Sequence, residues 1–416
     1  MKKHIITLLL TAMPVLTCVS QTLALYTKSG LTVLAAENEV DEMIVSGGQL
    51  TMGTQTFSIA DLDSLKYLQQ TFDPLRVQVN FADAKSSITL PLSLLPLLTI
   101  EQDGAYVNIT SAATTDPEIT YALQGTTTNG AFLLNGIYKC GLVLNGVNIT
   151  SRRGAAIRIN NGKRIDVELV KGTTNNLADC QQGLQDACLH IKGHPEFKGE
   201  GTLNITGNTR HAYKSGEYTL LKRSTGAINI LAAVGDAMHI GQYFHMQGGQ
   251  ITISPDVQKD GIQVDKDSDT TKINNGMVFL DSGIVNINLK SDDVSGIKCD
   301  STFTCNGGNY TITMSGKAAK GIDVTRNAHI FATTSTPEFN LTASGGYLTV
   351  LGKKKKSACF KVDGNLYFHA GKITTQATGD KARGLKVNGD YYYVPAKTTL
   401  TPNSPNVDGA IRVMAE

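Results

Sequence analysis

The sequence predicts an all-β protein whose main body is a parallel β-helix, and three observations lead to that prediction. A short strand motif (a small residue, an apolar residue, a polar residue and a second apolar residue) recurs along the chain. If the first apolar residue is taken as a marker, six of the nine steps between markers span 24 to 26 residues. Two further strand-like segments separate successive markers, with Gly, Asn and Asp at the corners. A fixed period of about two dozen residues is typical of a solenoid, and three short strands per unit indicate a β-helix.

The repeat predicts roughly ten coils between about residues 132 and 411, with the markers pointing into the core. The markers are Ile157, Leu189, Tyr213, Met238, Ile262, Ile297, Ile322, Phe360, Leu385 and Ile411. The second strand of each unit is aromatic, as at 243–246, 277–280, 303–305 and 366–368. The third follows Gly, as at 249–253, 283–287, 308–312 and 346–350.

Residues 1–20 have the pattern of a signal peptide. A basic start precedes the apolar run 5–16, which is too short to span a bilayer. Cleavage after Ser20 predicts an exported protein that is secreted, periplasmic or held at the cell surface. A lipid anchor on Cys18 is the alternative. No later segment is long and apolar enough to be a transmembrane helix.

The remaining chain divides into a β-rich module and cap over 21–131 and the β-helix over 132–416. The pattern from Thr22 to Val33 predicts a hairpin that turns at Ser29-Gly30. We expect the rest of the module to cover the first coil, because the open end of a solenoid exposes unpaired strand edges.

Composition narrows the possible partners. The chain has 38 Lys and Arg against 36 Asp and Glu, a formal net charge of +2, which does not favour nucleic acid. Trp is absent, which argues against a flat aromatic platform for crystalline cellulose. Nothing in the sequence defines the oligomeric state.

Six cysteines follow the predicted signal peptide. Cys188 and Cys359 occupy the small-residue position before a marker, which predicts core packing. In an exported protein disulfides are also possible, and Cys299 and Cys305 lie on consecutive strands where they would be able to pair.

Aspartates at the coil corners are the candidate metal ligands. Asp236, Asp260 and Asp293 are interpreted as the same corner on three consecutive coils, and Asp265 and Asp300 both follow a marker by three residues. Equivalent positions on neighbouring coils lie about 4.8 Å apart, where stacked carboxylates repel unless a cation lies between them. Calcium, which prefers several oxygen ligands, is the predicted ion. The alternative is that Asp serves only as a turn-forming residue.

The long step between Ile262 and Ile297 adds further candidates. Its insertion contributes Asp267 and Asp269, and Asp292 lies beside the third corner. Lys259, Lys266 and Lys298 lie near the acidic corners and are predicted to contact an anionic ligand. His239 and His245 are expected to be surface strand residues rather than ligands.

Several of these motifs, in this order, resemble a family of bacterial secreted carbohydrate-binding β-helix proteins, related in fold to pectate and other polysaccharide lyases. The resemblance covers about 132–390, and its motifs are residues 147–150, 155–160, 172–179, 199–205, 234–239 and 260–265. It implies a right-handed parallel β-helix, bound calcium, and binding of plant cell-wall polysaccharide of the acidic pectin type. The Asp-Gly-Ile phrase of the family is complete only at 260–262.

Three functions remain open from the sequence. The first is non-catalytic binding of an acidic polysaccharide with calcium. The second is a polysaccharide lyase, in which calcium acidifies the C–H next to a uronate carboxylate and a lysine removes the proton. The third is a structural or adhesive surface solenoid. Binding and elimination would use the same calcium bridge, so the carboxylates alone do not separate the first two.

Overall fold

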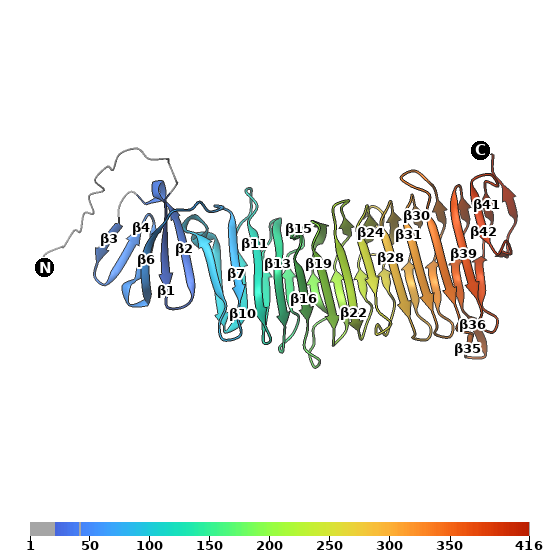
Figure 1. The fold of residues 1–416 in the computed structure, drawn as a ribbon, viewed down its shortest axis with the longest axis horizontal. Coiled ribbons are helices and arrows are strands. Elements are labelled where there is room, and N and C mark those ends of the chain that lie inside the picture. Colours follow the sequence, from blue (N-terminus) through green and yellow to red (C-terminus); the bar gives the residue numbers. More distant parts are fainter. Residues whose placement is uncertain (1–20, 41–42, 416) are drawn as a thin grey trace.

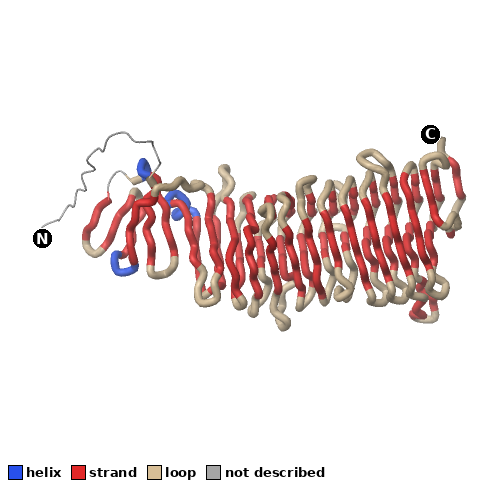
Figure 2. Tube along the Cα trace, viewed as in Figure 1, coloured by secondary structure: helices blue, strands red, loops and turns tan. Residues whose placement is uncertain are grey.

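The computed structural model describes residues 21–40 and 43–415, and the predicted signal peptide lies outside them. The described chain is almost entirely β-strand and forms one elongated stack of coils (Figure 1). The predicted parallel β-helix is confirmed by long runs of parallel strand pairs that continue from coil to coil. Helical structure is limited to three short 3-10 helices, and none of the described helices is long and apolar enough to cross a membrane (Figure 2).

Each complete coil contributes three strands, one to each face of the solenoid. The strands that carry the markers form a 13-stranded sheet, here called the marker sheet. It consists of β9 (Leu98–Asp103), β10 (Ala105–Ser111), β12 (Gly130–Asn135), β14 (Ile157–Asn160), β17 (Ala187–Ile191), β20 (His211–Ser215), β23 (Met238–Ile240), β26 (Ile262–Val264), β29 (Ser295–Cys299), β32 (Lys320–Val324), β37 (Ala358–Val362), β40 (Arg383–Val387) and β43 (Asn406–Val407).

The other two faces belong to one 26-stranded sheet. The second face consists of β15 (Arg164–Leu169), β18 (His194–Lys198), β21 (Thr219–Leu221), β24 (Tyr243–Met246), β27 (Met277–Leu280), β30 (Phe303–Cys305), β33 (Ala328–Ile330), β38 (Leu366–Phe368), β41 (Tyr391–Tyr393) and β44 (Ile411–Val413). The third face consists of β16 (Thr174–Ala178), β19 (Thr202–Gly207), β22 (Ala227–Ala233), β25 (Gln250–Ile253), β28 (Ile284–Leu289), β31 (Asn309–Met314), β34 (Glu338–Ala343), β39 (Gly371–Ala377) and β42 (Thr398–Thr401). The long strand β13 (Cys140–Thr150) pairs with both β15 and β16.

Nine of the ten predicted markers lie in one register along the marker sheet. Each pairs directly with the next, from Ile157 to Leu385, and all nine are buried. The prediction of the tenth marker, Ile411, is wrong, because Ile411 lies on β44 of the second face and is 55% exposed. The marker sheet continues instead through β43, where Val407 pairs with Val387. The last coil is shorter than the repeat, so counting a full step from Leu385 overshoots the sheet.

The small residue before each marker is required by close packing between coils. A Cβ added at Gly261 would lie 2.3 Å from the carbonyl oxygen of Gly296 on the next coil. Cys188 and Cys359 occupy the same position and are fully buried, as predicted for core packing. All six cysteines among the described residues are free, Cys299 and Cys305 included.

The segment 346–350 is the other strand that the sequence assigned incorrectly. It forms β35 (Tyr347–Val350), which pairs only with β36 (Lys353–Lys356) in an antiparallel hairpin outside the three faces. The third-face strand of this coil is β34. The step from Ile322 to Phe360 holds more residues than a coil needs, and the surplus is accommodated as a hairpin.

Parallel pairing begins before Phe132, within residues that the sequence assigned to the N-terminal module. β7 (Arg76–Phe81) pairs in parallel with β11 (Thr120–Thr127), and β10 with β12. The predicted hairpin is confirmed as β1 (Thr22–Thr27) and β2 (Leu31–Ala36). The other elements of this region are β3 (Met43–Ser46), β4 (Gln49–Met52), β5 (Gln55–Ser58), β6 (Leu62–Leu68), β8 (Ser87–Pro91), η1 (Glu37–Glu39), η2 (Ile59–Asp61) and η3 (Leu92–Leu97).

Candidate functional site

The outward surface of the marker sheet carries a continuous row of polar side chains. In a strand, successive side chains point to opposite faces, so the residue after each buried marker points outward. These residues pair from coil to coil about 4.8 Å apart and are here called the outward row. The outward row is Arg158, His190, Lys214, His239, Gln263, Lys298, Asp323, Lys361 and Lys386.

Near the middle of the row, Asp236 joins neighbouring coils. Its Oδ1 accepts a hydrogen bond from the backbone N–H of Asp260 at 3.1 Å. Its Oδ2 lies 2.8 Å from Nδ1 of His239 and 3.3 Å from Nδ1 of His211. Burial opposes ionisation of this carboxyl group, but its contacts with His211 and His239 outweigh burial and hold its pKa below the usual value. Nδ1 of His211 also accepts a hydrogen bond from the backbone N–H of Asp236 at 3.0 Å. Asp236 is therefore a carboxylate engaged on both oxygens.

The two histidines beside Asp236 differ in charge. His239 lies between two carboxylates, with Nε2 3.2 Å from Oδ2 of Asp265. Burial alone would lower its pKa, but the hydrogen bonds to Asp236 and Asp265 raise it to about 9. Burial lowers the pKa of His211, whose ring stacks on His239 with centroids 4.4 Å apart. His239 is thus an imidazolium at neutral pH, whereas His211 is neutral.

Asp260 has the opposite electrostatic environment from Asp236. Its side chain is 17% exposed, and Oδ1 accepts a hydrogen bond from the backbone N–H of Ser295 at 2.6 Å. Burial raises its pKa to about 6, and the negative charge of Asp236 adds to the shift. The positive charge of Lys298 opposes this rise in pKa, because its Nζ lies 3.7 Å from Oδ2 of Asp260. A carboxylate with this much uncompensated charge is a good candidate to bind a cation.

Asp265 and Asp300 complete the acidic cluster, which is here defined as Asp236, Asp260, Asp265 and Asp300. Asp300 has a pKa raised by burial and by the nearby charge of Asp265. Gln263, which is 5% exposed, donates a hydrogen bond from Nε2 to Asp265. The Oε1 atom of Gln263 is buried and has no hydrogen-bond partner among the described residues. An unpartnered buried oxygen is costly, and it adds an oxygen donor beside the carboxylates.

The structure separates the other predicted aspartates from this cluster. Asp267 forms an ion pair with Lys272 at 2.8 Å, and Asp269 accepts two hydrogen bonds from Thr271 within the inserted loop. Oδ1 of Asp292 accepts the backbone N–H of Lys317 at 2.7 Å.

The predicted alignment of Asp293 with Asp236 and Asp260 is wrong. Asp236 and Asp260 each precede a marker by two residues. Because Ile262 pairs with Ile297, the residue in the equivalent position on the next coil is Ser295, two residues after Asp293. Asp293 instead forms ion pairs with Lys320 at 3.6 Å and Lys355 at 2.7 Å.

Of the three predicted lysines, Lys298 has the closest contact with the cluster. Lys266 lies beside Asp300 but is exposed, and Lys259 is exposed next to Asp260 in the chain. His211 and Gln263 were not among the residues predicted from the sequence. The strand motif could have indicated both residues, because His211 precedes a marker by two residues, as Asp236 and Asp260 do, and Gln263 directly follows a marker, as His239 and Lys298 do.

Two donor sets for a cation meet here. The ligand atoms of His211, Asp236 and His239 lie within 4.8 Å of one another, and such a nitrogen-rich set suits a transition metal. The oxygens of Asp265, Asp300 and Gln263 are of the type that calcium prefers, and the buried Oε1 of Gln263, whose Nε2 donates to Asp265, has no hydrogen-bond partner among the described residues. Asp260 lies at the other end of β26 from Asp265 and contacts Asp236.

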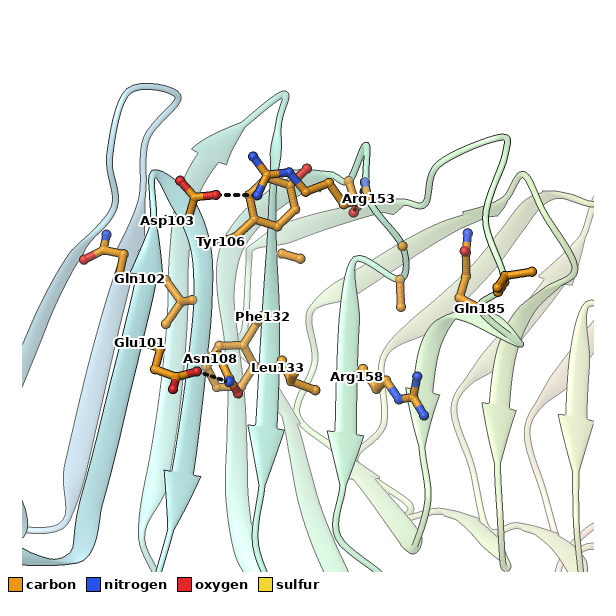
Figure 3. Close-up of a pocket in the computed structure, with 16 residues that line it drawn as sticks. Glu101, Gln102, Asp103, Tyr106, Asn108, Phe132, Leu133, Arg153, Arg158 and Gln185 are labelled. Atoms are coloured by element: carbon orange, nitrogen blue, oxygen red, sulfur yellow. Dashed lines mark hydrogen bonds and ion pairs between the residues drawn. The ribbon is translucent and has the colours of Figure 1, made fainter.

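A separate groove of about 590 Å³ lies on the same outward surface near the N-terminal end of the marker sheet (Figure 3). The Arg153 guanidinium lies 4.2 Å from the ring centroid of Tyr106 and forms an ion pair with Asp103. Arg158, the first cation of the outward row, lies at the same groove, and Leu184 from the loop before β17 is fully exposed there. No motif in the sequence analysis indicated this groove.

The fold is a parallel β-helix with a polar outward surface, and a comparison of sequences identifies the family. The chain belongs to the family described as carbohydrate-binding domain-containing protein, which matches residues 103–389. A carbohydrate-binding domain-containing protein of Acetivibrio thermocellus is 29% identical over 140 residues. That region covers 31% of this chain and 48% of the relative, so the chain spans about half of that protein's length.

A solved structure has the same fold. It is described as the polysaccharide lyase-like protein from C. thermocellum, in a gadolinium derivative. The two chains are 20% identical with a TM-score of 0.50, and the match covers 64% of this chain and 100% of the other. At this identity the likeness concerns the fold alone.

Proposed function

We propose that this protein binds an acidic polysaccharide of the pectin type through a calcium ion at the acidic cluster, and that it does not cleave the chain. The observation that carries the proposal is the acidic cluster, in which Asp265 and Asp300 lie beside a buried oxygen of Gln263 that has no partner among the described residues, while Asp260 is a buried carboxyl with a raised pKa. Membership of the carbohydrate-binding family supports a polysaccharide as the ligand. Calcium would neutralise the cluster and accept a uronate carboxylate as an additional ligand.

The chain's own residues would orient the ligand around that ion. Lys298 and Lys214 flank the cluster in the outward row and would pair with further carboxylates along the polymer. His239, held protonated between Asp236 and Asp265, adds a third positive charge on the same surface.

The position of Lys298 supports binding without cleavage. Lys298 lies 3.7 Å from the Asp260 carboxylate, so it is engaged in an ion pair instead of being free to act as the base of a β-elimination. The predicted signal peptide supports an exported location, where calcium and plant polymers are both accessible. Fractionation of the producing cell, with detection of the protein in each fraction, tests that location.

Retention on immobilised polygalacturonate tests the binding proposal. We expect retention with calcium, loss of retention with EDTA, and loss in Asp260→Asn even with calcium. Asp292→Asn is the matched control and should be retained like the wild type, because its exposed carboxylate lies outside the acidic cluster and accepts a hydrogen bond from the backbone N–H of Lys317. Failure of the wild type to bind any uronate in a panel would favour the structural or adhesive solenoid.

A parallel assay tests the absence of cleavage. Protein, calcium and polygalacturonate are incubated at mildly alkaline pH, and the absorbance of the unsaturated product is followed. We expect no increase. An increase that Lys298→Ala abolishes would instead identify a lyase.

A further inference from the structure

A second groove on the marker sheet is lined almost entirely by cations. It lies towards the C-terminal end, has a volume of about 420 Å³, and is bounded by strands β32, β37 and β40 and by the β35–β36 hairpin. Figure 1 shows where this hairpin lies. Seven of its ten lining residues are basic and none is acidic. The seven are Lys320, Lys354, Lys355, Lys356, Lys361, Arg383 and Lys386. We refer to it as the lysine groove.

The register of the solenoid builds this concentration of charge. Lys361 and Lys386 are neighbours in the outward row, one coil apart. Lys320 and Arg383 share a second column, two residues before their markers, with Ala358 between them. The hairpin then brings its lysine run to the side of these strands. Like charges held about 4.8 Å apart repel, so the folded chain keeps these cations together at a cost.

Carboxylates within the protein offset only part of that charge. Asp293 pairs with Lys320 and Lys355, and the pairs of Lys361 and Lys386 use Asp323, Asp363 and Asp408. Four carboxylates therefore face seven cations. Among the described residues, no ion pair is formed by Lys354, Lys356 or Arg383. Three of the seven cations are thus left without an ion pair in the described part of the chain.

Two details indicate that an anion would be accommodated. Lys386 is only 7% exposed, and its one carboxylate partner among the described residues, Asp408, is itself 63% exposed. Beside the hairpin, Lys354 and Lys381 both lie over the ring of Tyr347, at 4.5 Å and 4.9 Å from its centroid. The two contacts place two cations side by side over one aromatic ring.

We infer that the lysine groove binds the negatively charged groups of a polysaccharide directly, without a metal ion. This rests on the proposed polysaccharide function but assigns a different site and a different chemistry. Ammonium groups bind sulfate or carboxylate with little geometric demand, which suits a repeating anionic chain. Single-stranded nucleic acids are usually held by aromatic stacking as well, and no aromatic residue lines this groove.

The test measures binding by calorimetry in EDTA, so that the calcium site is inactive. The probes are oligogalacturonate, a sulfated dextran oligomer of similar length and neutral dextran. The variant carries Lys354→Gln, Lys356→Gln and Arg383→Gln. A matched control carries Lys85→Gln, Lys163→Gln and Lys290→Gln, three exposed lysines outside the groove with the same change in net charge.

We expect one or both anionic probes to bind the wild type and the control, with affinity that falls as salt rises, and neutral dextran not to bind. The groove variant should bind roughly tenfold or more weakly. The double variant Lys354→Gln/Lys356→Gln leaves β40 intact and should lose part of the affinity if the triple variant is poorly folded. The carboxylate and sulfate arms identify which anion is preferred.

Three results would overturn the inference: no binding of either anionic probe in EDTA, equal losses in the groove variant and the control, or tighter binding of a single-stranded oligonucleotide of equal charge. Asp260→Asn separates this site from the calcium proposal, because it should leave binding in EDTA unchanged. Loss of calcium-dependent retention alone would contradict only the proposed function.

Discussion

Replacement of Asp260 by Asn provides the sharpest test of the acidic cluster. Burial raises the pKa of Asp260 from an ordinary 3.8 to about 6. The folded protein therefore binds more protons than the unfolded chain between these two values, and its stability falls as pH rises through that window. The shift corresponds to about 3 kcal/mol at neutral pH. Asn keeps an oxygen that is able to accept the hydrogen bond from Ser295 and removes the charge.

In EDTA we expect Asp260→Asn to be more stable than the wild type at pH 7, by up to about 3 kcal/mol. The two proteins should converge as pH falls through 3.8, where the wild-type carboxyl becomes protonated in both states. Melting temperatures by circular dichroism from pH 3.5 to 8 measure this difference. Calcium should raise the melting temperature of the wild type by mass action and leave that of the variant unchanged.

Asp293→Asn is a control for which the opposite change in stability is expected. Burial opposes ionisation of Asp293, but its ion pairs with Lys355 and Lys320 outweigh burial and lower its pKa. This pairing stabilises the fold above the pKa of the unfolded carboxyl and is lost as pH falls through the lower folded value. Asp293→Asn should therefore be the less stable protein at pH 7. A difference between Asp260→Asn and the wild type that does not vary with pH would refute the assigned burial of charge.

Three further outcomes are expected. By nuclear magnetic resonance, the His239 ring in metal-free protein should titrate near pH 9. The stability that the protonated ring contributes should be complete below about pH 6.5 and lost as pH rises through 9. Titration near 6.5 would contradict the position of His239 between two carboxylates. No thiol should react with a labelling reagent in the folded protein and all six beyond the signal peptide should react after denaturation, whereas a bond between Cys299 and Cys305 would leave four. Phe360→Ala should lower the free energy of unfolding by about 3–5 kcal/mol, because Phe360 is fully buried. Phe331 is partly exposed, so Phe331→Ala should lower the free energy of unfolding clearly less. Equal losses would argue against the assignment of Phe360 to the core.

The fold was largely predictable because the register of its strands is determined by short local sequence motifs. Each marker must be buried and each preceding residue small, so periodicity alone aligns nine strands from Ile157 to Leu385. The errors occur where local pattern and register diverge. Asp293 precedes a marker by four residues and not two, and Ile411 follows a shortened coil.

The site was only partly predictable for a different reason. Asp236 and Asp260 belong to the repeat, and their contact follows from it. The two grooves depend on segments outside the repeat, such as the loop that carries Leu184 and the hairpin that carries Lys354. The period of the strands gives no information about how these segments fold back on the marker sheet.

The three long steps of the repeat have a consequence for how such a protein diversifies. Their extra residues are 179–186, 265–276 and 344–357, and they contribute to the first groove, the region beside the acidic cluster and the lysine groove, respectively. The strands on either side of each insertion keep the pairing of their neighbours. Recognition is thus able to change by exchange of a loop at a corner while the ladder that sets the architecture is inherited intact. Transplanting the hairpin 347–356 into a shorter step of the same chain would move a patch of positive charge to another coil without redesign of the core.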